Sequence, residues 1–188
     1  MSYLHGVGNS EVATSLTTPT TSSAGLQVIF GTAPIHLAKD PYKAANTPKL
    51  CYSFAECQEA LGYSDDFENF TLCQSMDANF RVYNNSPIVL VNVLDPNKAA
   101  HTTENAEETV TVTGGMATYT KQYVLLPSLV VKNDATPLAA DVDYTAVHDD
   151  DGNVTIVLLS TTAKEATALK ITSKSIKPSG VTKTDVVG

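Results

Sequence analysis

With 188 residues, the chain has room for one ordinary domain or two small ones, and 43% hydrophobic against 17% charged residues is the composition of a folded protein. A net charge of −8, with Arg81 as the only arginine, argues against a nucleic-acid partner, because a nucleic-acid binder needs basic groups to replace phosphate counterions. The N-terminus lacks the pattern of a secretory signal, and no apolar stretch reaches the roughly 20 residues that cross a bilayer. We therefore expect a protein made in the cytoplasm without direct membrane insertion.

Residues 1–23 are predicted to form an extended N-terminal arm and linker. The front of this segment contains β-forming residues, so we expect it to become extended when it meets a partner. Residues 17–23 are hydroxyl-rich around Pro19, which favours an irregular linker, because hydroxyl side chains compete for the backbone and proline blocks a helix.

Residues 24–100 are predicted to form a partial α/β core in the order strand, helix, helix, strand. The runs 26–33 and 88–94 are continuously apolar, which is typical of strands that are buried on both faces of an α/β sheet. Between these runs, two stretches carry helix signals.

The first helix is predicted over about 54–61. Ser53 and Glu56 have the spacing of a capping box, and Gly62 is a typical residue for the end of a helix. The second helix is expected to follow the cap and acidic residues at 64–66. Its apolar positions 70, 73, 76 or 77, and 80 recur at steps of three or four, which predicts a stripe that faces the sheet.

Residues 101–188 are predicted to form a β-rich domain, either a sandwich or a barrel, which makes the whole chain an α+β protein. β-branched stretches alternate with turn residues, and helical signals vanish from about residue 103. The clearest hairpin joins 144–147 to 154–158 through the turn at 150–153. The last strand is expected at 168–172, followed by a polar tail.

No catalytic, cofactor or metal site is predicted, and we do not expect an enzyme. The histidines lack metal-binding spacing and are expected to be ordinary surface or hydrogen-bonded residues; they are His5, His36, His101 and His148. The run 149–153 resembles a calcium loop, but no glutamate closes it, which favours a solvated turn. The cysteines are expected to be reduced thiols in the core; they are Cys51, Cys57 and Cys73. Helix capping accounts for the acidic residues Asp65, Asp66 and Glu68.

The first 96 residues contain a series of short sequence segments whose order along the chain is characteristic. They are SYLHGV at 2–7, SEV at 10–12, the stretch from AGL to FGTAP at 24–34, DPYKA at 40–44, LCYS at 50–53, ALGYS at 60–64, FTLC at 70–73 and VNVLDP at 91–96. Taken together, they resemble the N-terminal part of contractile tail sheath proteins, as found in myophages and R-type tailocins.

The resemblance implies a structural subunit that polymerises around an inner tube and contracts to drive that tube through a cell envelope. It implies as partners other sheath subunits, the inner tail tube protein and the baseplate, and it places the protein in the tail of a virion or tailocin. In this family the N-terminal arm adds a strand to the sheet of a neighbouring subunit. The arm residues to which the resemblance assigns this strand exchange are Tyr3, Leu4, His5, Val7, Glu11 and Val12.

The chain departs from the family in two respects. Gly8 and Asn9 stand where the family tends to have β-forming residues, which predicts weaker or bulged pairing of the arm. Family members are also considerably longer, and the β-rich part resembles an insertion domain in the core, whose returning half we expect to be missing here. An apolar sheet edge or face should then be exposed and promote self-association.

Two other readings remain open. The first is a baseplate or adhesive tail component whose β-rich domain binds a cell-surface ligand. The second is a fragment of an α/β enzyme with an inserted β-domain, whose catalytic groups would lie elsewhere.

Overall fold

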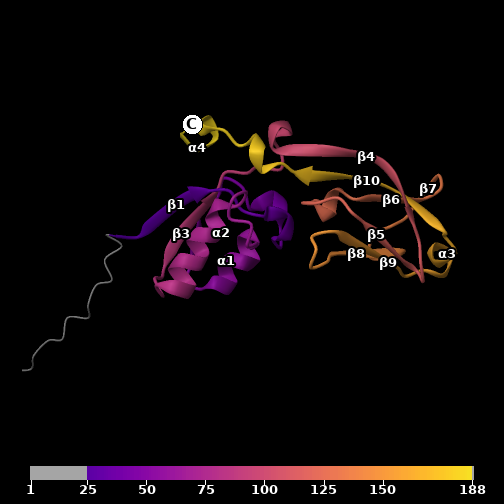
Figure 1. The fold of residues 1–188 in the computed structure, drawn as a ribbon, viewed down its shortest axis with the longest axis horizontal. Coiled ribbons are helices and arrows are strands. Elements are labelled where there is room, and N and C mark those ends of the chain that lie inside the picture. Colours follow the sequence, from indigo (N-terminus) through magenta and orange to yellow (C-terminus); the bar gives the residue numbers. More distant parts are fainter. Residues whose placement is uncertain (1–24, 188) are drawn as a thin grey trace, which may run out of the picture.

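The computed structural model describes residues 25–187, which form a mixed α+β structure with mostly sheet and few helices. Figure 1 shows two groups of elements along the longest axis of the molecule. One group, residues 25–100, is here called the core, and the other, residues 101–176, is called the β region. The chain end after residue 176 returns to the core. No helix in the described part of the chain is long and apolar enough to span a membrane.

The core is built on a three-stranded sheet in the order β1-β3-β2. Strand β1 (Gln27–Gly31) runs parallel to the central strand β3 (Ile88–Asn92), and the short strand β2 (Lys49–Cys51) pairs antiparallel with the other edge of β3. The strands predicted within 26–33 and 88–94 are thus confirmed, and the structure shows that they are neighbours. Strand β2 was not predicted, because three residues are too few to show an alternating pattern.

The first predicted helix is confirmed as α1 (Phe54–Leu61). The Ser53 hydroxyl accepts a hydrogen bond from the Glu56 amide at 3.3 Å, and the Glu56 carboxylate accepts one from the Tyr52 amide at 2.7 Å. At the other end, Gly62 has φ 76°, and a Cβ there would lie 2.3 Å from the Pro34 carbonyl oxygen. Only glycine fits both conditions, which is why the helix ends there.

The second helix begins later than predicted. Helix α2 (Thr71–Met76) continues without a break into a π-helical segment, η3 (Asp77–Val82). The Asp66 carboxylate does not cap this helix. It accepts instead from the amide and the side chain of Asn69, at 3.2 and 2.8 Å, and so closes the turn that precedes the helix. The capping role expected for the acidic stretch is therefore wrong for Asp66.

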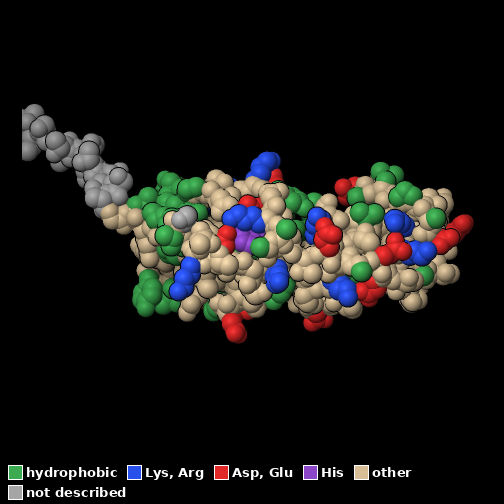
Figure 2. All heavy atoms as spheres, turned by 90° about the horizontal axis from the view of Figure 1, so that it is seen from above, with side chains coloured by type: hydrophobic (Ala, Val, Ile, Leu, Met, Phe, Trp, Pro, Cys, Tyr) green, Lys and Arg blue, Asp and Glu red, His purple; other side chains and the backbone are tan. Residues whose placement is uncertain are grey.

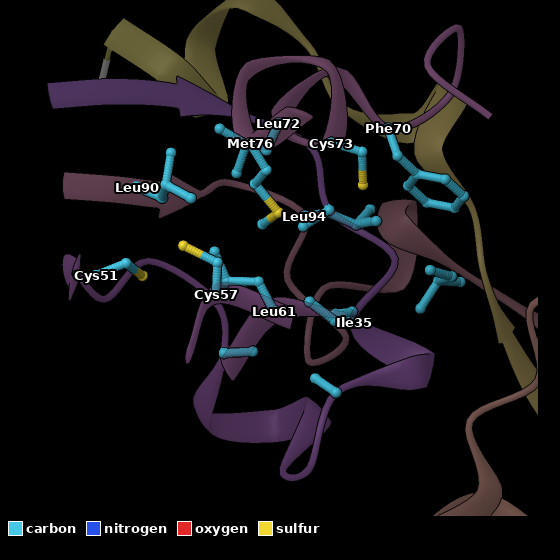
Figure 3. Close-up of a cluster of buried hydrophobic side chains, with 14 of the residues drawn as sticks. Ile35, Cys51, Cys57, Leu61, Phe70, Leu72, Cys73, Met76, Leu90 and Leu94 are labelled. Atoms are coloured by element: carbon cyan, nitrogen blue, oxygen red, sulfur yellow. The ribbon is translucent and has the colours of Figure 1, made fainter. Parts of the chain in front are cut away.

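The helices cover one face of the core sheet. A buried cluster joins the strands to both helices, and its side chains point toward one another in Figure 3. The fully buried members from the sheet and helices include Ile88, Leu90, Cys57, Leu61, Leu72 and Met76. The three cysteines are free and buried in this cluster, as predicted.

The other face of the sheet is open at the edge strands β1 and β2, which corrects the prediction for the first strand. Val28 and Phe30 of β1 are 51% and 53% exposed, although the run was expected to be buried on both faces. β1 is an edge strand whose inner face alone meets the helices. Periodicity cannot distinguish this situation from full burial when every residue in the run is apolar.

The β region contains two sheets that share one hydrophobic cluster. The first has the order β4-β10-β6-β7, and its members are β4 (Thr102–Thr111), β10 (Ala168–Ile176), β6 (Val130–Asn133) and β7 (Thr136–Pro137). The second has the order β5-β9-β8, and its members are β5 (Met116–Tyr119), β9 (Val154–Leu158) and β8 (Tyr144–His148). The predicted β8–β9 hairpin is confirmed. A short helix, α3 (Thr161–Lys164), contradicts the expectation that helices are absent here; the Ser160 hydroxyl caps it.

After β10 the chain does not form the predicted polar tail. It makes a short turn, η6 (Pro178–Gly180), and ends in helix α4 (Lys183–Val187) beside the core. The Asp185 carboxylate accepts a hydrogen bond from Lys98 at 2.7 Å and lies 3.4 Å from the buried His101 imidazole. These contacts hold the two ends of the β region together, because Lys98 and His101 precede β4.

Candidate assembly surface

The open face of the core sheet is the main apolar surface of the core. Cross-strand register places five apolar side chains on this side, of which Val91, opposite Phe30, is only 7% exposed. We define the apolar sheet face by the other four: Val28, Phe30, Leu50 and Val89. Val89 is the register partner of both Val28 and Leu50, so one row of apolar groups crosses all three strands. Figure 2 shows hydrophobic side chains gathered at the end of the molecule that the core forms.

The exposure of this face is unusual for a water-facing sheet surface. Val28, Phe30 and Leu50 are 51%, 53% and 48% exposed, whereas outward positions of such a sheet are normally polar. Contiguous exposed apolar groups typically mark a surface that another chain segment covers. The physical character of this face is thus that of an interface.

The outer edge of β1 adds a second binding feature. Among the described strands, only β3 pairs with β1, so the backbone amides and carbonyls on the other edge are available for an added strand. Added strands bind mainly through main-chain hydrogen bonds, which tolerate many sequences. An apolar face beside an open edge can therefore accept an extended segment with apolar side chains.

The residues that were predicted to exchange strands between subunits all lie outside the described residues. They are Tyr3, Leu4, His5, Val7, Glu11 and Val12. The sequence did not predict that Leu50 belongs to this face, because strand β2 was not predicted. The only sequence signal for that strand was the short apolar segment that begins at Leu50.

A second notable group of side chains lies where the core meets the β region. We define this seam by His36 and Phe70 from the core, with Tyr123 and His148 from the β region. The ring of His36 lies 5.3 Å from that of His148 and 5.5 Å from that of Tyr123. The Tyr123 hydroxyl donates to the Asp66 carboxylate at 2.9 Å, which is a direct hydrogen bond between the two parts.

The seam histidines contradict the expectation that every histidine is an ordinary or satisfied one. Within residues 25–187, Nδ1 of His36 and both ring nitrogens of His148 are buried without a hydrogen-bond partner. Burial, helped by the neighbouring His148, lowers the pKa of His36 to about 3. By contrast, His101 is a hydrogen-bonded histidine, as predicted, because its Nδ1 accepts a hydrogen bond from the Asp95 amide at 3.0 Å.

Reactive side chains of the described residues include the Cys73 thiol and the Asp149 carboxylate. No group of three or more histidine, cysteine or acidic side chains in residues 25–187 could hold a metal ion. The Cys73 thiol is a poor nucleophile, since burial raises its pKa to about 11. The acidic run in the β8–β9 turn is occupied by its own backbone: the Asp149 carboxylate accepts from the amides of Asp151 and Asn153.

Comparisons with protein-family models, with curated proteins and with solved structures find no match for this chain.

We predict that the apolar sheet face drives self-association. Replacing Val28 and Phe30 together with threonine should weaken association by at least about tenfold, because the two side chains supply one to three kcal/mol each, roughly, when buried. Threonine keeps the β propensity, and both sites are half-exposed, so folding should be retained. Sedimentation velocity over a concentration series measures the effect.

A matched control changes Met116 and Val147 to threonine. These residues lie on strands of the β region and are 51% and 50% exposed, close to the 51% and 53% of the test pair. Equal loss of association in both double variants, or none in the first, would contradict a specific role for this face.

Proposed function

We propose that the chain is a structural subunit of a contractile tail sheath, which polymerises around an inner tube and contracts to drive that tube through a cell envelope. The observation that carries this proposal is the apolar sheet face beside the open edge of β1. The proposed arm, residues 1–23, is joined to β1 by a few residues, so an arm bound to a neighbouring subunit would connect directly to the sheet. Strand addition of this kind links rigid bodies while a flexible linker lets them rotate.

The path of the chain supports a finer proposal, a partial α/β core that carries an inserted β-sandwich. The first and last strands of the β region begin and end as register partners, Thr102 opposite Ile176. The amide of Lys177 then donates to the His101 carbonyl at 2.7 Å. Entry and exit lie side by side, which is the geometry expected of a domain inserted into another.

The proposed partners follow from the same role. They are other copies of the subunit, the inner tail tube protein and the baseplate, and the proposed location is the tail of a virion or tailocin. The acidic composition supports a role without a nucleic-acid partner.

Negative-stain microscopy of the full-length gene product, expressed without other particle components, tests the proposal. Striated tubes or rings are the expected result, because sheath subunits carry their own intersubunit contacts. Dispersed monomers under several salt conditions would overturn it.

One feature favours the alternative role as a baseplate or adhesive component. A cleft of about 510 Å³ lies at one end of the second sheet, lined by Gly115, Met116, Leu159 and Lys164, among others. Exposed loops at the tip of a β-domain are a common place for ligand binding. A protein of this class would bind cells without needing the N-terminal arm.

A further inference from the structure

The seam is built almost entirely from aromatic rings that meet edge to face. The ring of Phe70 lies 5.4 Å from that of Tyr123 at 88°, and the ring of His36 lies 5.3 Å from that of His148 at 84°. Both distances lie in the range in which such pairs attract one another. The His36 residue keeps only 8% of its exposure, so this ring is packed as a hydrophobic group.

Both histidines must be neutral for the seam to remain closed. A buried imidazolium needs acceptors for both N–H groups, and among the described residues the orphaned nitrogens make no hydrogen bond, although the carbonyls of Val124 and His36 lie near the His148 ring. Two positive rings at 5.3 Å would also repel one another in a largely buried contact. The contact therefore favours the deprotonated form of both residues.

The other titratable groups around the seam are already engaged or exposed. They line a cleft of about 300 Å³ beside His36, and they are Tyr63, Asp66, Tyr123, Asp149, Asp150 and Asp151. Asp66 is occupied by Tyr123 and Asn69, and Asp149 by amides of its own turn. Asp149 and the carbonyls of Val124 and His36 favour the charged form of His148, but burial outweighs them and its pKa is lowered. No lysine or arginine lines this cleft.

We propose that the seam is a pH-sensitive joint, in which protonation of His36 and His148 in mildly acidic solution opens the contact between the core and the β region. Each part stays folded, because each has its own hydrophobic cluster. Leu125 of the β region is buried in the core cluster, and this packing opposes opening. Acid is therefore expected to raise the fraction of open molecules, while closed molecules remain in equilibrium with them. This inference does not depend on the proposed assembly role.

The direction of the effect follows from proton linkage. In the open state both imidazoles face water with a pKa near 6.5, whereas in the closed state both pKa values are lowered, that of His36 to about 3. The open state therefore binds more protons below about pH 6.5. The ratio of closed to open molecules should fall by up to about tenfold per pH unit for each histidine as the pH drops.

The test uses the full chain and two measurements. Nitrogen-15 NMR of the imidazole rings between pH 7.5 and 4 reports protonation. Hydrogen exchange of peptides that contain Leu37 and Val124, corrected for intrinsic exchange rates and compared with peptides of β9, reports opening of the seam. We expect the closed-to-open ratio to fall at least about tenfold between pH 7 and 5, with unchanged far-UV circular dichroism.

The double variant H36F/H148F keeps two aromatic rings but cannot be protonated, and its seam should open no more than about twofold over the same range. Asp150→Asn is the matched control, since it removes an exposed charge from the same cleft and should leave the pH dependence unchanged. If the double variant does not fold, H148F alone decides the question, and it should reduce the logarithmic pH slope by about half. Three results would each overturn the proposal of a pH-sensitive joint. They are imidazole pKa values near 6.5 in the parent protein, hydrogen exchange at the seam that does not depend on pH, and a double variant whose seam opens as much as that of the parent.

Discussion

Replacing Asn92 with alanine is expected to lower the free energy of unfolding by about 3–5 kcal/mol, because it leaves several buried backbone groups unpaired. The Asn92 side chain is fully buried at the end of β3. Its carbonyl oxygen accepts from the amides of Ala33 and Leu94 at 3.0 and 3.1 Å, and its amide donates to the Leu94 carbonyl at 2.9 Å. One side chain thus ties the loop after β1 to the chain leaving β3.

Urea denaturation followed by circular dichroism measures this loss. Asn97→Ala is the matched control, because the Asn97 side chain is exposed and bonds only the Asp95 carboxylate two residues away. We expect that control to lose less than about 1 kcal/mol. Similar losses in the two variants would show that the Asn92 hydrogen bonds do not organise the core.

Deleting residues 2–18 is expected to abolish assembly while leaving every contact described for residues 25–187 in place. The deletion removes the proposed donor strand but keeps the apolar sheet face and the open β1 edge. Tubes or rings seen for the parent by negative-stain microscopy should then be replaced by small species, and the thermal unfolding of the core should be unchanged.

Point variants test whether assembly needs the particular sequence of the arm or only its presence. Leu4→Asp with Val7→Asp places charges where the proposed strand needs apolar side chains, and it should act like the deletion. Thr20→Asp with Ser22→Asp adds the same charge to the linker and should assemble normally. Tubes from the deletion protein would contradict the proposed role of the arm, and retained binding to cell surfaces without any assembly would favour the adhesive alternative.

Features that depend on a few neighbouring residues were predicted correctly from the sequence. The helix at Phe54–Leu61 is confirmed because its cap, Ser53, and its stop, Gly62, act within one helical turn. The β8–β9 hairpin is confirmed for the same reason, since a short polar turn with Gly152 at φ 79° directs the two flanking strands to pair.

Features that depend on which distant segments meet were decided only by the tertiary structure. Strand β2 exists because β3 offers it an edge, and β1 is half-exposed because the helices cover one face of the sheet. The return of helix α4 depends on Asp185 meeting Lys98, far away in the sequence.

The seam shows most clearly how features that sequence patterns predict differ from features that depend on packing. His36 and His148 carry no local signal, since burial and the loss of hydrogen-bond partners arise only when the core and the β region pack together. The local elements could be predicted from the sequence, because their energies come from contacts within a turn or a hairpin. The tertiary structure decided exposure, edges and buried titratable groups, because burial is a property of the packed chain and not of any segment.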